Sequence, residues 1–221
     1  MKKTFGFTLA EVLITLGIIG VVAALTMPTF TTKTTTAKIG PQLAKAVSMF
    51  EQANKALLAD YESDSLQGVV LSDGTRLLKN GKTYMTALES HLNGTQSGNY
   101  SFYAADGTFY STSTKTFPST TDVCLKDTGS NATSPNKCVI ASSFYIDING
   151  YNKSPNKWGR DRFRFKLFDD GTLAPWGAVG NLPRGDSDNK WTEKCKSNEV
   201  PADYQYCAGS IFDNGLTVQY K

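Results

Sequence analysis

The sequence is poor in the groups that most enzymes use at their active sites. Its 221 residues include one histidine and four cysteines, and they contain no Gly-x-Ser-x-Gly, no Cys-x-x-Cys and no phosphate-binding glycine loop. The usual arrangements of nucleophile, base and cofactor are therefore missing. The one histidine, His91, is expected to be a surface or packing residue. The sequence predicts a protein that is not an enzyme.

Charge is nearly balanced, and long apolar runs are scarce. The formal net charge of +3 is too small to steer a charged partner by itself. Only one stretch, the 21 residues from Phe7 to Met27, is long and apolar enough to cross a membrane. As a helix it would reach close to the ~30 Å of a hydrocarbon core. Because Lys2 and Lys3 precede it, we expect a cytoplasmic amino end and an extracytoplasmic remainder.

One carboxylate, Glu11, lies inside this apolar run. An isolated acid in hydrocarbon costs roughly 2 to 3 kcal/mol on insertion scales, so such a group usually has a partner and a function. If the chain were cut before Phe7, the new amine would lie one helical turn from Glu11. In staggered parallel helices, Glu11 of one copy could then pair with the Phe7 amine of the next. The alternative is an isolated anchor whose acid protonates or reaches the interface.

The opening residues carry a resemblance to a known family. Lys2-Lys3, the run Gly6-Phe7-Thr8-Leu9-Ala10-Glu11-Val12-Leu13-Ile14 and the apolar stretch up to Pro28 resemble the leader and first helix of type IV pilins and type II secretion pseudopilins. The resemblance covers about the first 30 residues. It implies cleavage after Gly6 by a prepilin peptidase and methylation of the new amine on Phe7, both on the cytoplasmic side.

Three parts are expected: a leader (1–6), a long helix (7–61) and an extracytoplasmic head (62–221). Within the helix, 7–27 would form the membrane span and filament core, and 37–61 would be amphipathic. Proline lacks the helical N–H donor, so Pro28 predicts a kink or local opening, as in the pilin helices that this segment resembles. Threonines follow it, and they favour either a segment that can melt or a bent junction. Gly40-Pro41 predicts a bend or a restart of the helix.

An apolar stripe runs along the second half of this helix. Its members recur at steps of three and four, as expected of one helical face: Ile39, Leu43, Val47, Phe50, Ala53, Leu57 and Tyr61. The stripe most simply holds the head, with a short coiled coil as the alternative.

Short strands and turns dominate the head, which predicts an α+β fold with an antiparallel sheet, as in pilins. Asp-Gly and Asn-Gly pairs mark hairpins at 73–74, 80–81 and 106–107. A helix is expected over Thr83–Leu92. Strands are expected at Gly68–Ser72, Thr75–Leu78, Tyr100–Ala104, Thr108–Ser111, Val139–Ile148, Arg162–Phe168, Thr172–Leu173 and Leu216–Tyr220.

All four cysteines, Cys124, Cys138, Cys195 and Cys207, follow the span, on its expected extracytoplasmic side. Four cysteines allow three connectivities, and the sequence alone does not choose among them. Sequential pairing is favoured because it closes two short loops. A zinc site is disfavoured because the sequence has no Cys-x-x-Cys pair and His91 is far from the cysteines in sequence.

A polar stretch from Asp147 to Asp161 resembles the start of an oxygen-rich calcium loop. Asp147 and Asn149 alternate before a glycine, and Asn152 and Asp161 add oxygens, but no glutamate closes the loop as in an EF-hand. Some pseudopilins that the chain resembles hold calcium in a carboxy-terminal loop. No cofactor is required, and a structural calcium ion here competes with a network of Asx turns that only shapes the loop.

Basic residues and aromatic rings intermingle between Lys153 and Lys166. Such a run could contact nucleic-acid phosphates and stack on bases. However, Arg162, Arg164 and Lys166 alternate with apolar residues, which favours a strand with one wet and one buried face.

Together with these patterns, the resemblance implies a structural subunit of a type IV pilus or a type II secretion-like pseudopilus. Its partners would be other pilins in a helical filament, a prepilin peptidase and an inner-membrane assembly platform. It would wait in the bacterial inner membrane as a single-pass protein and then enter a periplasmic or cell-surface filament. The alternatives are a DNA-binding minor pilin of a DNA-uptake system and a membrane-anchored extracytoplasmic enzyme or receptor.

Overall fold

The computed structural model describes residues 6, 8–69, 82–98, 100–112, 125–126, 138–176, 195 and 206–218. At 27–35, 67–68, 96, 125–126 and 138–143 only the backbone is described. The chain divides into two units, Met1–Lys38 and Ile39–Lys221, and each is described by itself.

The first unit is dominated by helix α1, which begins at Leu9 and ends at Asp60 in the second unit. It contains no break at Gly40-Pro41, so the alternative of a restarted helix is wrong. Pro41 is exposed, and Gly40 is buried against the carboxy-terminal segment. A Cβ atom on Gly40 would lie 1.8 Å from the carbonyl oxygen of Leu216, so glycine is what allows the close approach.

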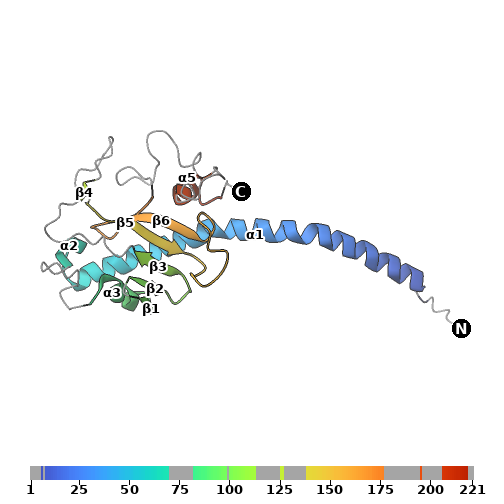
Figure 1. The fold of residues 1–221 in the computed structure, drawn as a ribbon, viewed down its shortest axis with the longest axis horizontal. Helices are drawn as coiled ribbons and strands as arrows, with labels where there is room; N and C mark the ends of the chain where they lie inside the picture. The colour runs from blue at the N-terminus through green and yellow to red at the C-terminus, as the bar shows by residue number, and fades with distance from the viewer. Residues whose placement is uncertain are drawn as a thin grey trace. The chain divides into compact units, whose positions relative to one another are not determined.

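In the second unit, an antiparallel sheet packs against the end of α1 (Figure 1). The strand order is β1-β2-β3-β5-β6-β7, with β4 also pairing with β5. The strands are β1 (Thr95–Gly98), β2 (Ser101–Tyr103), β3 (Phe109–Thr112), β4 (Leu125–Lys126), β5 (Cys138–Asp147), β6 (Arg162–Phe168) and β7 (Leu173–Pro175). The α+β fold and its antiparallel sheet are as predicted.

Among the described residues, three short helices accompany the sheet: α2 (Leu66–Val69), α3 (Tyr84–His91) and α5 (Cys207–Asp213). Helix α3 contacts β1 and β2, and α5 contacts β6 (Figure 1). The Thr83 hydroxyl caps α3 by accepting a hydrogen bond from the Thr86 N–H, which satisfies one of the free donors at a helix start. The predicted helix at 83–92 is therefore confirmed.

The core lies between α1 and one face of the sheet. The predicted stripe is confirmed: its members are buried, except for Val47 and Tyr61, which are partly buried against the core. Phe50 is fully buried, and its ring centroid lies 4.3 Å from that of Phe144 on β5 and 5.5 Å from that of Tyr110 on β3. The Tyr110 hydroxyl donates a hydrogen bond of 2.9 Å to the Ala46 carbonyl, which joins sheet and helix.

Two strand predictions are wrong in their described parts. Gly68 and Val69 belong to α2, whose first residue, Leu66, donates its N–H to the Asp169 carbonyl at 2.6 Å. Leu216 to Val218 form no strand, because the Leu216 N–H bonds to the Ile211 carbonyl at 2.8 Å and closes the end of α5. The predicted strand at 75–78 and the hairpins at 73–74 and 80–81 lie outside the described residues.

Candidate functional site

The apolar side chains of the span face outward in the isolated chain. Within the described residues, one helix is long and apolar enough to cross a membrane, and its apolar window covers Leu9–Thr26 with none of it buried. Leu13, Ile19 and Leu25 are 62%, 63% and 72% exposed. Such a continuous apolar surface requires a covering of lipid or of other apolar helices.

Glu11 forms a capping box with Thr8 at the start of α1. Its Oε2 atom accepts hydrogen bonds from the Thr8 N–H and the Thr8 hydroxyl, both at 2.8 Å. In return, the Glu11 N–H donates to the Thr8 Oγ1 atom at 3.3 Å. The lone acid therefore has hydrogen-bond partners within its own chain. The Thr-x-x-Glu spacing is the sequence signal for this role, although Thr8 was not among the site residues predicted from the sequence.

Several other residues with a predicted role in this segment are not among the described residues. Gly6 is exposed, but Phe7 and the lysines before Gly6 are not described. Pairing between Glu11 and a neighbouring Phe7 amine therefore stays a prediction. The backbone of α1 is helical at Pro28 and through the following threonines, while the side chains at 27–35 are not described.

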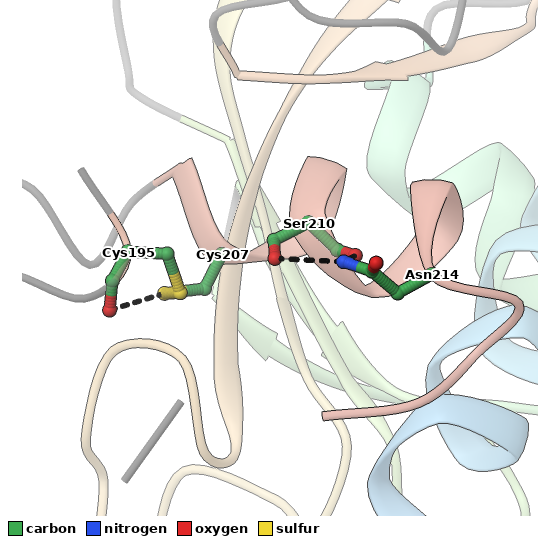
Figure 2. The surroundings of a disulfide bond; sticks show 4 residues. All are labelled: Cys195, Cys207, Ser210 and Asn214. Atoms are coloured by element: carbon green, nitrogen blue, oxygen red, sulfur yellow. Dashed lines mark hydrogen bonds between the residues drawn. A yellow bond between two sulfur atoms is a disulfide. The ribbon is translucent and has the colours of Figure 1, made fainter. Parts of the chain in front are cut away.

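One of the two predicted disulfides is confirmed. Cys195 and Cys207 are bonded, with Cα atoms 5.0 Å apart, and both are buried next to the start of α5 (Figure 2). The Cys207 sulfur lies 3.9 Å from the Cys195 carbonyl oxygen, but a disulfide sulfur carries no proton to donate. At the other end of α5, the Asn214 side-chain amide donates to the Ser210 carbonyl at 2.7 Å. Cys124 and the side chain of Cys138 lie outside the description.

The loop between β5 and β6 gathers most of the residues predicted for calcium. Asp147 ends β5, and its Oδ1 atom accepts hydrogen bonds from the backbone N–H groups of Asn149 at 3.3 Å and Gly150 at 3.0 Å. Asp161 precedes β6, and its carboxylate accepts from the N–H groups of Asn156 at 2.6 Å and Lys157 at 2.5 Å. Asp147 and Asp161 are 2% and 3% exposed.

Asn149 connects the two carboxylates, and Asn156 contacts one of them. The Asn149 side-chain amide donates to Asp161 Oδ2 at 3.3 Å and to the Ser154 carbonyl at 3.1 Å. Asn156 contacts Asp161 through its backbone N–H, whereas the predicted ligand Asn152 is exposed. Asn156 lies within the polar stretch from Asp147 to Asp161 but was not among the predicted ligands.

Burial, and after it the neighbouring charge of Asp161, raise the pKa of Asp147 to about 6, against the lowering effect of the two backbone N–H donors and of Arg162. The ionised carboxylate of Asp147 is therefore poorly stabilised by the protein groups around it.

Strand β6 has the alternation predicted from the sequence. Phe163, Phe165 and Leu167 are fully buried, and the three basic residues between and before them are half-buried on the other face. The Arg162 guanidinium lies 4.8 Å from the centroid of the Trp158 ring, and that of Arg164 lies 3.4 Å from the centroid of the Trp176 ring. These arginines stack on aromatic rings of the same head.

His91, the sole histidine, pairs with Asp60 at the end of α1. Its Nε2 atom lies 3.1 Å from Asp60 Oδ2. The contact joins α3 to α1.

The described residues form an α+β protein, with an apolar helix near the amino end that is followed in the sequence by an antiparallel sheet. Residues 1–27 match the family model of the prokaryotic N-terminal methylation motif. The protein therefore carries the prepilin-type segment of type IV pilins and pseudopilins. No curated protein and no solved structure matches the chain.

Proposed function

We propose that the protein is a structural subunit of a type IV pilus or type II secretion-like pseudopilus. The observation that carries this proposal is the coincidence of the methylation motif over 1–27 with an exposed apolar helix that holds a single acid, Glu11. A prepilin peptidase would cut after Gly6, and the amine of Phe7 would then be methylated. The apolar helices of many copies would pack together as the filament core, with the heads outside.

The role proposed for Glu11 changes between the membrane and the filament. In the single chain its carboxylate is held by Thr8, which lowers the cost of placing an acid in the bilayer. In the filament the Phe7 amine of an adjoining subunit would approach the same carboxylate. Breaking a buried ion pair by removing one partner costs about 3 to 5 kcal/mol, enough to select one axial register between subunits.

Substitution of Glu11 tests this proposal. We expect Glu11→Gln to leave membrane insertion unchanged and to reduce filament yield at least tenfold, because the neutral amide cannot neutralise the amine of its neighbour. Filament yield is measured by shearing and immunoblotting, and membrane insertion by fractionation. Asp64→Asn, which removes an exposed acid just after α1, is the matched control and should assemble normally.

Normal filaments from Glu11→Gln would contradict the pairing. Loss of the protein from the membrane would instead show that Glu11 acts in insertion.

A further inference from the structure

The loop between β5 and β6, here called the basic loop, presents cations to solvent and keeps its acids inside. Residues 148–160 contain no aspartate or glutamate, and the two aspartates that flank them are buried. Lys153, Lys157 and Arg160 are exposed. Among the described residues, none of these three cations forms an ion pair. The exposed surface of the loop is therefore positively charged.

Two aromatic rings lie among these cations. Tyr151 is 50% exposed, and Trp158 is half-buried. The Arg162 guanidinium already lies over both rings, at 5.4 and 4.8 Å from their centroids, which leaves them less available for stacking on the bases of a nucleic acid. Tyrosine, tryptophan, lysine and arginine are the residues that gather where a protein meets the headgroup layer of a bilayer.

The basic loop lies at the end of the second unit where α1 enters it. A Cβ atom on Gly150 would lie 2.8 Å from the Gly107 carbonyl oxygen, in the turn between β2 and β3. The same turn is joined to the early part of this α1 segment by the ion pair between Lys45 and Asp106, at 2.9 Å. By contrast, the turn between β6 and β7 accepts a hydrogen bond from Asn54, farther along the helix.

We propose that the basic loop binds the anionic headgroups of the membrane in which α1 is anchored. The span tethers the head beside that surface, so a weak contact is favoured by the high local concentration of headgroups. Each basic residue near a bilayer rich in anionic lipid strengthens binding by about fivefold, and the loop supplies three. The bent junction predicted at Pro28 would let the head lean toward the surface.

Such a contact would orient the subunit while it waits in the membrane, and it would be lost when the subunit leaves. The inference rests on the membrane span of the proposed function and not on filament assembly.

Hydrogen exchange of the full-length protein in lipid nanodiscs tests the proposal. Nanodiscs of phosphatidylcholine alone are compared with nanodiscs that also contain phosphatidylglycerol. We expect amide exchange in residues 148–160 to be at least about threefold slower in the anionic nanodiscs. The difference should disappear at high salt, because salt screens the attraction between exposed charges.

Variants show whether the exposed cations cause the slower exchange. The triple substitution Lys153→Gln, Lys157→Gln and Arg160→Gln should abolish the difference between the two lipids. Lys157→Gln alone should reduce it, whereas the matched control Lys55→Gln, which removes an exposed cation on α1, should not. All of these side chains are exposed, so the variants should melt at the wild-type temperature.

Quenching of tryptophan fluorescence by a lipid with a spin label on its headgroup is a second readout. We expect stronger quenching in anionic than in neutral nanodiscs. Trp158→Phe should remove most of this difference, because phenylalanine retains a ring at this position without the indole fluorescence.

Equal exchange of the basic loop in neutral and anionic nanodiscs would overturn the proposal. So would slower exchange caused in neutral nanodiscs by a single-stranded oligonucleotide but not by anionic lipid, because the loop would then bind a soluble polyanion. A protein that does not enter nanodiscs at all would instead contradict the membrane span, and with it both this inference and the proposed function.

Discussion

Asn54 shows how a single polar side chain holds the head together. It is fully buried on α1, and its amide donates to the Gly171 carbonyl at 3.0 Å and to the Phe50 carbonyl at 3.2 Å. Its Oδ1 atom accepts a hydrogen bond from the Tyr84 hydroxyl on α3. One residue thus joins α1, α3 and the turn between β6 and β7.

Removal of the Tyr84 hydroxyl should therefore destabilise the head. Tyr84→Phe leaves the buried Asn54 Oδ1 atom without this donor, and we expect a loss of about 1 to 3 kcal/mol in the free energy of unfolding of the head. Chemical denaturation of the full-length protein in detergent, followed by tryptophan fluorescence, measures it. Tyr100→Phe is the control, because Tyr100 is 42% exposed, and it should change stability little. Equal stability of the two variants would contradict the role given to Asn54.

Residues of strand β6 alternate between the core and the opposite face of the sheet, and the buried ones continue a row that begins on the neighbouring strands. Phe163 pairs with Ile146, which pairs with Tyr110, and Tyr110 pairs with Phe102. All four are fully buried, so one continuous apolar row crosses the sheet. Phe165 lies beside this row, next to Phe144 on β5.

Substitution on the two faces of β6 should therefore have unequal effects. We expect Phe165→Ala to cost about 3 to 5 kcal/mol, because it leaves a cavity in the core. Lys166→Ala, on the half-buried opposite face, should cost less than about 1 kcal/mol. Denaturant unfolding of the two variants measures both. A similar cost for both would contradict the assignment of faces.

Helix α5 depends on a covalent link as well as on packing. The bond between Cys195 and Cys207 spans 12 residues, and loop entropy predicts a stabilisation of about 3 kcal/mol. The double substitution Cys195→Ala with Cys207→Ala should lower the free energy of unfolding by about this amount. It should also increase amide hydrogen exchange in α5. Unchanged exchange in α5 would show that packing alone holds this helix.

Elements with a strong period were predictable from the sequence, and elements fixed by distant contacts were not. The stripe on α1 and the alternation in β6 each repeat a simple pattern over several turns or residues, so local reasoning found them. The segment Gly68–Ser72 resembles a strand in sequence, but its first two residues belong to helix α2, whose Leu66 N–H donates a hydrogen bond to the distant Asp169 carbonyl. The segment Leu216–Tyr220 has the composition of a strand. However, the backbone of Leu216 closes α5 with a φ of +64°.

The candidate sites follow this rule only in part. Glu11 was identified because an acid in an apolar run is conspicuous in any sequence. Thr8 was missed although the capping spacing was present. Asn156 was missed because only the folded loop brings its N–H group to Asp161.

At the scale of the whole molecule, the chain joins two parts with opposite requirements. Residues 9–26 expose apolar side chains that water cannot cover, while the unit from Ile39 onward buries its own core around Phe50. An anchor and a self-sufficient head are what a subunit needs if it waits in a membrane and later packs into a filament. The methylation motif over residues 1–27 agrees with this division.

The mass of the mature protein's amino-terminal peptide tests whether the chain is processed as a prepilin. We expect the protein isolated from its native membrane or filament to begin at Phe7, to have lost Met1 to Gly6 and to carry one added methyl group on the new amine. A mature chain that still begins at Met1, or one from which the entire apolar helix has been removed, would contradict it.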